Sequence, residues 1–339
     1  MKQKVDILII TNKPSFYKIR LYNEIEKSRK IFVIFYNNSM THRTSDFFDE
    51  KIKFSFLIFK KYNSILSYIM LIKYLKEITY SRLIVSGWNS FYSWIAAFIS
   101  PKRYNELVIE SSCYESITHG LKALIKKKIL SRFSLAYVPG ENNETLLKML
   151  SFKGTIKKTY GVGLYRRVSA PIFEKRDKIN NFLYVGRLAH EKNLFFLIEQ
   201  FNKMPEFTLT IIGFGPLESE LKKKAKENII FIGEIKNKDL PEYYRKNDIL
   251  VLPSTSEPWG LVVEEALNNG IPVIVSNKVG CINEVVVNQW NGMIYDNTES
   301  SFMNVINEIT KPEIYNKIRM NVCSFNYEER EKMQVNVYL

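Results

Sequence analysis

The chain has 339 residues, which is enough for two domains of ordinary size, and 46% of them are hydrophobic, as in a folded globular protein. Its longest apolar stretches fall well short of the roughly 20 residues that a membrane helix needs, and its first residues lack the pattern of a secretory signal. Three cysteines and three histidines are too few and too scattered for a disulfide framework or a zinc centre. These features favour a reducing cytoplasm and exclude an integral membrane protein.

The positive charge is concentrated in one half of the chain. The formal net charge is +14; residues 1–160 hold 27 Lys and Arg against 12 Asp and Glu, whereas residues 161–339 hold 22 against 23. A basic half indicates an anionic partner, either a phospholipid surface or a nucleic acid. The plainer interpretation is a lysine-rich composition on solvated faces.

Short apolar runs alternate with amphipathic helices along the first half. Strands are expected at Val5–Ile10, Ile31–Tyr36, Arg82–Gly87, Glu106–Ser111 and Leu135–Gly140, and helices at Phe16–Lys27, Ser64–Ile78, Phe91–Ser100 and Leu121–Phe133. Such alternation predicts a parallel sheet with helices on both faces.

The same pattern restarts after a polar, glycine-bearing stretch that begins at Phe152. Strands are expected at Asn181–Leu188, Thr208–Gly215, Ile229–Ile235, Asp248–Ser254, Pro272–Ser276 and Gly292–Asp296. We therefore predict an α/β protein of two doubly wound, Rossmann-like domains that face each other across a cleft: residues 1–160, a linker at 161–180, residues 181–310, and a helical segment at 311–339 that returns toward the first domain. Ligands in such sheets bind beyond the carboxyl ends of the strands.

The run "YVGRLAHEKN" places Gly186 and Arg187 at the end of a predicted strand and Lys192 five residues later. Two cations that converge on a strand-end crevice suit a diphosphate, because together they can neutralise its charge.

The run "EPWGLVVEE" places two acids eight residues apart. Glu257 is expected in a loop, Gly260 would let the backbone approach a ligand, and the helix that follows can hold phosphate oxygens with its first amides. Glu265 would face the same crevice, where the hydroxyls of a ribose are suitable donors. The alternative is an ordinary capping box, which would explain Glu257 or Glu264 without a function.

The second half also resembles a known family. The runs "VGRLAHEKN", "GFGPLESEL", "FIGEI", "YYRKNDILVLPSTSEPWGLVVEEALNNGIPVIVS" and "NGMIYD" are similar, in order, to the donor domain of the family 4 retaining glycosyltransferases, which have the GT-B fold. The resemblance covers about Phe182 to Asp296.

The resemblance implies a role for each matching residue. Gly186, Arg187 and Lys192 would bind the donor diphosphate, Glu265 the ribose and Glu257, as the catalytic glutamate, the sugar hydroxyls. The backbone of Trp259, Gly260, Leu261 and Val262 would hold phosphate, and the loop at Ile235 would line the nucleobase. No metal and no other cofactor are expected, since the chain has no Asp-x-Asp motif and the cations can take the part of a divalent ion.

The first half departs from the family pattern. Many relatives carry a Gly-Gly loop after the first strand, where this chain has "TNKPSFYKIRLYNEI". Candidates on the acceptor side are Lys18, Arg20 and Glu110. Many relatives also place a histidine near the sugar; His119 could take that catalytic part, although Glu110 lies nearer the strand edge. The alternative is that His119 is an ordinary surface residue before Gly120.

The family and the charge together predict the substrates. We expect transfer of a hexose or N-acetylhexosamine, with retention, from a UDP-sugar to a lipid-linked saccharide during O-antigen or capsule synthesis. The basic helix "LKALIKKKILSRF" and a second apolar segment at residues 60–76 suit the anionic cytoplasmic face of the inner membrane, unless their apolar faces lie in the core. Alternatives are another GT-B enzyme, with a soluble acceptor or an epimerase activity, and a nucleic-acid-binding protein, for which no binding motif is found.

Overall fold

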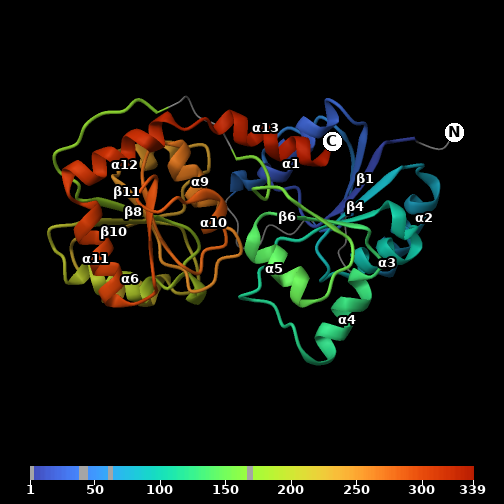
Figure 1. The fold of residues 1–339 in the computed structure, drawn as a ribbon, viewed down its shortest axis with the longest axis horizontal. Helices are drawn as coiled ribbons and strands as arrows, with labels where there is room; N and C mark the ends of the chain where they lie inside the picture. Colours follow the sequence, from blue (N-terminus) through green and yellow to red (C-terminus); the bar gives the residue numbers. More distant parts are fainter. Residues whose placement is uncertain (1–3, 38–44, 60–63, 166–170) are drawn as a thin grey trace. The chain divides into compact units, whose positions relative to one another are not determined.

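The computed structural model describes residues 4–37, 45–59, 64–165 and 171–339 and divides the chain into two compact units (Figure 1). The first comprises residues 1–41, 48–164 and 328–339, and the second comprises residues 42–47 and 165–327. Parts of the segment 60–76 and of the predicted linker 161–180 lie outside the described residues. Within those residues, no helix combines the length and the apolar composition that crossing a membrane requires.

The first unit is built on a parallel sheet of seven strands in the order β3-β2-β1-β4-β5-β6-β7. These strands are β1 (Ile7–Thr11), β2 (Ile31–Phe35), β3 (Ser55–Ile58), β4 (Arg82–Ser86), β5 (Asn105–Val108), β6 (Leu135–Val138) and β7 (Thr155–Lys158). The helices are α1 (Phe16–Glu26), α2 (Ile65–Glu77), α3 (Phe91–Ile99), α4 (Gly120–Leu130), α5 (Glu141–Met149) and α13 (Tyr327–Tyr338), with a short 3-10 turn at Lys102–Tyr104. Another 3-10 turn, Ser45–Phe48, lies mostly within residues 42–47, which belong to the second unit.

Strand β1 is the point at which the order of the first sheet reverses. It pairs in parallel with β2 on one side, where Ile7 lies opposite Ile31, and with β4 on the other, where Ile7 lies opposite Arg82. All five residues of β1 are buried, as expected of a strand covered on both faces. The loops that leave β1 and β4 therefore diverge, which opens a crevice at their carboxyl ends.

Helix α13 completes the first unit from the far end of the chain. The guanidinium of Arg82 donates to the backbone carbonyl of Tyr338 (2.6 Å), and it also binds the carboxylate of Glu106 (2.8 and 2.9 Å). The ring of Tyr338 stacks on that of Tyr137, with centroids 4.5 Å apart. A half-buried cation that is paired in this way anchors the helix to the sheet.

The second unit has a parallel sheet of six strands in the order β10-β9-β8-β11-β12-β13. These strands are β8 (Asn181–Val185), β9 (Thr208–Ile212), β10 (Ile229–Gly233), β11 (Ile249–Leu252), β12 (Val273–Ser276) and β13 (Gly292–Tyr295). The helices are α6 (Leu194–Asn202), α7 (Glu218–Lys224), α8 (Leu240–Lys246), α9 (Leu261–Asn268), α10 (Ile282–Val285), α11 (Glu299–Ile309) and α12 (Pro312–Ser324), with a 3-10 turn, η3, at His190–Lys192. Here the order reverses between β8 and β11.

Three elements of the first unit were not predicted. These are strands β3 and β7 and helix α5. Strand β7 and helix α5 carry little periodic apolar pattern, and β7 lies inside the polar stretch that begins at Phe152, whereas β3 is a short apolar run, SFLI. Both strands are sheet edges of four residues; the residues of β3 are exposed or half-buried, and those of β7 alternate between the two. Short edge strands that carry lysine avoid pairing with other chains, which accounts for Lys157 and Lys158 in β7. Strand β3 carries no lysine.

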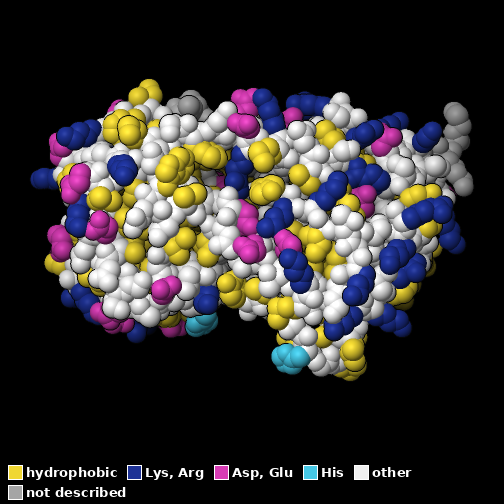
Figure 2. Space-filling view, viewed as in Figure 1, with side chains coloured by type: hydrophobic (Ala, Val, Ile, Leu, Met, Phe, Trp, Pro, Cys, Tyr) yellow, Lys and Arg dark blue, Asp and Glu magenta, His cyan; other side chains and the backbone are white. Residues whose placement is uncertain are grey.

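Helix α4 differs from an ordinary helix of this fold, because much of its apolar face is exposed. Leu121, Leu124 and Ile125 are 74%, 63% and 42% exposed, while Ile129 is buried in the core. The expectation that these leucines could lie in the core is therefore wrong for the first two turns of α4. Figure 2 shows Lys and Arg side chains, with apolar ones among them, over the part of the first unit that carries α2, α3 and α4 in Figure 1.

Candidate functional site

The loop after β8 begins with a glycine that the local packing requires. Gly186 has φ +157°, and a Cβ there would lie 2.7 Å from the hydroxyl of Tyr184. Its carbonyl approaches Gly213, where a Cβ would come within 1.9 Å of it. Arg187 follows with its side chain about half exposed and paired with Glu191, so the guanidinium stands at the carboxyl edge of the sheet.

Lys192 and Glu257 are brought together across 65 residues of sequence. The ammonium of Lys192 pairs with the carboxylate of Glu257, and their side chains are only 16% and 14% exposed. The amide of Thr255 donates to the carbonyl of Glu191 (2.9 Å), which ties the two loops to each other. Lys192, which was predicted to bind the diphosphate, and Glu257, which was predicted to bind the sugar, are therefore paired with each other in the structure.

The loop that carries Glu257 is attached to the loop after β12. The amide of Glu257 donates to Lys278 (3.2 Å), and its carbonyl accepts from the amide of Gly280 (2.8 Å). Gly260 has φ +100°, and a Cβ there would lie 3.0 Å from Val279, so both conformation and space favour glycine. This glycine directly precedes α9.

The first turn of α9 presents amides that have no partner inside the helix, as at every helix start. Leu261 and Val262 at this end of the helix are half-buried. It follows β11, as the residues Gly186 to Lys192 follow β8, so both groups lie at the point where the second sheet reverses. Helix starts in this position can bind phosphate oxygens.

Glu265 lies on the second turn of α9 and accepts a hydrogen bond from the hydroxyl of Tyr244 (2.9 Å). Burial raises the pKa of Glu265 from 4.5 to about 7; the bond from Tyr244 opposes this rise, and the nearby charge of Glu264 adds to it. The group can therefore change its protonation near neutral pH. Tyr244 is a part of this arrangement that the sequence did not indicate.

Glu264 has a structural position in the same helix. It is buried, and its carboxylate accepts a hydrogen bond from the indole nitrogen of Trp259 (2.8 Å). The indole of Trp259 is also buried, so only its backbone can offer contacts to a ligand. Ile235 lies half-buried in the loop that follows β10, at the same edge of the sheet.

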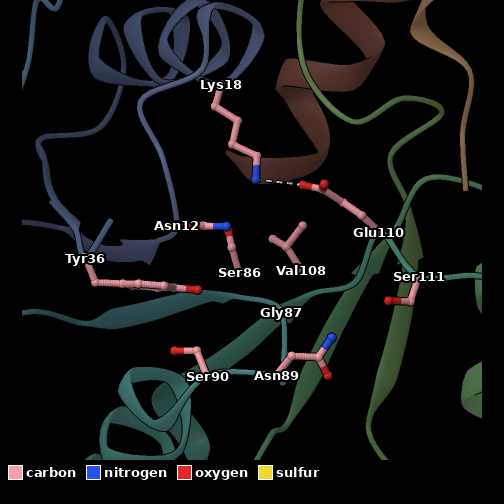
Figure 3. Close-up of a pocket in the computed structure, with 10 residues that line it drawn as sticks. All are labelled: Asn12, Lys18, Tyr36, Ser86, Gly87, Asn89, Ser90, Val108, Glu110 and Ser111. Atoms are coloured by element: carbon pink, nitrogen blue, oxygen red, sulfur yellow. Dashed lines mark ion pairs between the residues drawn. The ribbon is translucent and has the colours of Figure 1, made fainter. Parts of the chain in front are cut away.

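The first unit has a pocket of about 260 Å³ at the reversal of its own sheet (Figure 3). It is lined by Asn12, Lys18, Tyr36, Ser86, Gly87, Asn89, Ser90, Val108, Glu110 and Ser111. These residues lie at or just beyond the carboxyl ends of β1, β2, β4 and β5, except Lys18, which reaches in from α1.

Lys18 and Glu110 form an ion pair of 2.9 Å on the wall of this pocket. Burial alone would lower the pKa of Lys18, but the carboxylate of Glu110 outweighs it and holds that pKa well above its ordinary value. Arg20 is not brought to the pocket and pairs instead with Glu50 (2.7 Å). His119 is exposed at the start of α4 and does not line it.

Two of the three acceptor candidates therefore share one pocket, and Arg20 does not. The carboxylate at the strand edge is Glu110, as its position after β5 indicated. The roles assigned to all these residues stay predictions.

Solved structures with the same arrangement define the class of this fold. The galactosyltransferase WaaB of the lipopolysaccharide outer core superposes with a TM-score of 0.71 over 98% of this chain and 99% of its own, at 19% identity. HepE of Anabaena, in complex with UDP-glucose, gives 0.72 over 98% and 99%, at 16% identity. The chain has the GT-B fold of glycosyltransferases.

Sequence comparison identifies the family. Residues 166–323 match the family described as Glycosyl transferases group 1. The predicted resemblance is confirmed there.

Two Escherichia coli proteins are similar. The UDP-Gal:alpha-D-GlcNAc-diphosphoundecaprenol alpha-1,3-galactosyltransferase is 30% identical over 198 residues, which is 50% of each chain. The O-antigen biosynthesis glycosyltransferase WbnH is 35% identical over 119 residues, 34% of this chain and 33% of its own. The chain thus matches half or less of the length of these relatives.

Proposed function

We propose that this protein is a retaining glycosyltransferase that moves a hexose or N-acetylhexosamine from a UDP-sugar to a lipid-linked saccharide in the synthesis of a cell-surface polysaccharide. The observation that carries the proposal is the grouping of Arg187, Lys192, Glu257, Glu265 and the start of α9 at the reversal of the second sheet. Two cations, two carboxylates and a helix start match the parts of a nucleotide-diphosphate sugar.

The donor would be held in three places. Arg187, Lys192 and the first amides of α9 would bind the diphosphate, and Glu265 would accept hydrogen bonds from the ribose. Glu257, which lies beside Lys192, would contact the sugar hydroxyls next to the diphosphate. The complexes of HepE with UDP and with UDP-glucose lend support, since that protein shares the fold.

The chemistry would depend on electrostatic stabilisation of the leaving group. Negative charge develops on the diphosphate as the bond to the anomeric carbon breaks, so cations fixed beforehand stabilise the transition state more than the ground state. Arg187 and Lys192 would supply this charge without a metal ion. We propose retention of the anomeric configuration because the second half of the chain resembles the retaining glycosyltransferases.

The acceptor would be reached at the cytoplasmic face of the inner membrane. The relative named for a diphosphoundecaprenol-linked substrate supports a lipid-linked acceptor. In α4, exposed Leu121 and Leu124 stand next to Lys122, Lys127 and other lysines. Apolar side chains among exposed lysines suit a bilayer of anionic lipids, in which the leucines enter the interface and the lysines meet the head groups.

The test is nucleotide binding followed by transfer. Thermal unfolding is measured with UDP, ADP, GDP and their glucose conjugates, each with magnesium and with EDTA. We expect UDP or a UDP-sugar to raise the unfolding temperature equally in both media, and transfer to survive EDTA. Loss of transfer in EDTA would refute the metal-free mechanism, and no response to any nucleotide sugar would refute the proposed function.

A further inference from the structure

We propose that the pocket of the first unit binds an uncharged, hydroxyl-rich sugar ring and rejects acidic sugars and phosphate, and that the Lys18–Glu110 pair determines this preference. This inference deepens the proposed function. It rests on that function only for the question of whether the sugar ring belongs to the donor or to the acceptor. Its first step is the position of the pocket, since the reversal of a doubly wound sheet is where such folds bind ligands.

The second step is the charge of the pocket wall. Of the ten lining residues only Lys18 and Glu110 carry charge, and they neutralise each other at 2.9 Å. The side chain of Lys18 is 11% exposed and that of Glu110 is 35% exposed, so a ligand meets the carboxylate more readily than the ammonium. A phosphate or a uronic acid would therefore face a negative group, whereas sugar hydroxyls can donate to it.

This local preference runs against the net charge of +14 on the chain. A basic surface would attract anions in general, but among the described residues that line the pocket the one cation, Lys18, is already paired with Glu110. The basic surface and the pocket would thus have different ligands.

The third step is the remaining lining, which suits a ring of fixed shape. Asn12, Asn89 and Ser111 can each donate and accept hydrogen bonds. The ring of Tyr36 is stacked on that of Tyr92, with centroids 4.7 Å apart and planes 10° apart, so it forms a rigid wall. A volume of about 260 Å³ is below the 300–1,000 Å³ typical of sites for larger ligands, which limits the occupant to about one sugar ring.

The test compares three forms of the full chain. Removing Glu110 alone would leave Lys18 charged and unpaired in a buried position, so the main variant is Lys18→Met with Glu110→Gln, which removes both charges and keeps the volume. The control is Lys148→Met with Glu144→Gln, which removes an ion pair of the same unit on α5, together with the contact of Glu144 to Lys158 on β7 (3.4 Å), all outside the pocket. Unfolding temperatures show that each form is folded.

The first measurement is saturation-transfer NMR with methyl glucoside, methyl galactoside, methyl N-acetylglucosaminide, methyl glucuronide and pyrophosphate. We expect at least one neutral glycoside to bind the native and control proteins and to bind the pocket variant at least tenfold more weakly, the size expected for losing hydrogen bonds to a charged group. Any binding of glucuronide or pyrophosphate should be equally strong in the native protein and in the pocket variant. Equal dependence of neutral and acidic ligands on the pair would overturn the inference, as would equal binding of the neutral glycosides to all three forms.

The second measurement identifies the source of the ring. A rise in KM for the acceptor alone in the pocket variant assigns the ring to the acceptor, and a rise for the donor alone assigns it to the donor sugar; both outcomes support the site. Unchanged KM values for both substrates would overturn it. The NMR comparison needs no transfer, so it can succeed even if the proposed function fails, and nucleotide binding can succeed even if the pocket inference fails.

Discussion

Replacing Glu257 by Gln should tighten the binding of UDP while it slows transfer. In the protein without ligand, the carboxylate of Glu257 already occupies one side of the Lys192 ammonium. An incoming diphosphate must therefore compete with a carboxylate for that cation. Glutamine keeps the shape of the side chain and removes the competitor.

The size of the effect follows from the exposure of the two groups. Two unit charges 4 Å apart attract each other by about 4 kcal/mol at an effective dielectric constant of about 20. Both side chains keep some contact with water, at 16% and 14% exposure, so we take about 1 to 2 kcal/mol as the part that competes with UDP. Since about 1.4 kcal/mol corresponds to a factor of ten, the Kd for UDP should fall by about tenfold.

The free variant should also be less stable than the native protein. Lys192 would be left mostly buried without its paired carboxylate and with only the electrostatic interaction with Glu191, and UDP would then supply the missing negative charge. Thermal unfolding should show a lower Tm without UDP and a larger rise with it, while calorimetry measures the Kd directly. Turnover should fall, because Glu257 is the predicted contact of the sugar in the transition state.

The matched control is Glu191→Gln. Glu191 pairs with Arg187, another predicted diphosphate ligand, but the two side chains are 37% and 49% exposed. Exposed pairs contribute little, so the Kd for UDP should change by less than about threefold. A Kd for Glu257→Gln that equals or exceeds the native value would refute the competition between Glu257 and the diphosphate.

Three further predictions concern α9 and α4. The pKa of Glu265 is raised from 4.5 to about 7 by burial, so the folded protein keeps a proton that the unfolded chain loses between these values; its contribution to stability is complete below about pH 4.5 and is lost as the pH rises to 7. The affinity of the native protein for UDP, measured by calorimetry, should rise from pH 6 to pH 8, because the ribose binds the carboxylate of Glu265. If the native protein and Glu265→Gln bound UDP equally well over this range, the ribose role of Glu265 would be wrong. Glu264→Ala should lower the free energy of unfolding by about 1 to 3 kcal/mol, because the Trp259 indole loses its acceptor, whereas Glu264→Gln should stay near native in denaturant titrations; equal losses would contradict this. Leu121→Ser with Leu124→Ser should reduce co-sedimentation with phosphatidylglycerol vesicles but leave unfolding unchanged, and equal binding to phosphatidylcholine vesicles would argue against anionic recognition.

Much of the second unit could be predicted because its information is local. Each strand is a short, mainly apolar run, and the spacing of Glu257 and Glu265 lies within one loop and helix. The pairing of Lys192 with Glu257 was beyond reach, since periodicity does not reveal which loops meet across a sheet edge. The same holds for Tyr244, which lies on helix α8 and donates a hydrogen bond to Glu265.

The first unit was predicted less completely for a different physical reason. Its edge strand β7 is polar because sheet edges face water, so it looks like a loop in the sequence. The apolar face of α4 looks like that of any core helix, and only the structure shows which leucines remain exposed. Lys18 and Glu110 are 92 residues apart in the chain, so only the parallel sheet between them explains how they meet.

The attachment of α13 to the first unit has a consequence for the order of folding during synthesis. Arg82 and Tyr137 receive their contacts with Tyr338 only after residues 165–327 have been made. At about 5 to 20 residues per second, the ribosome needs roughly 10 to 30 s for that stretch. The second unit is continuous in the chain apart from residues 42–47, so it can fold within this time, whereas the first unit waits with the Tyr137 ring uncovered. The first part of the chain to emerge is therefore the last to be finished, and newly made chains should depend most on chaperones during that interval.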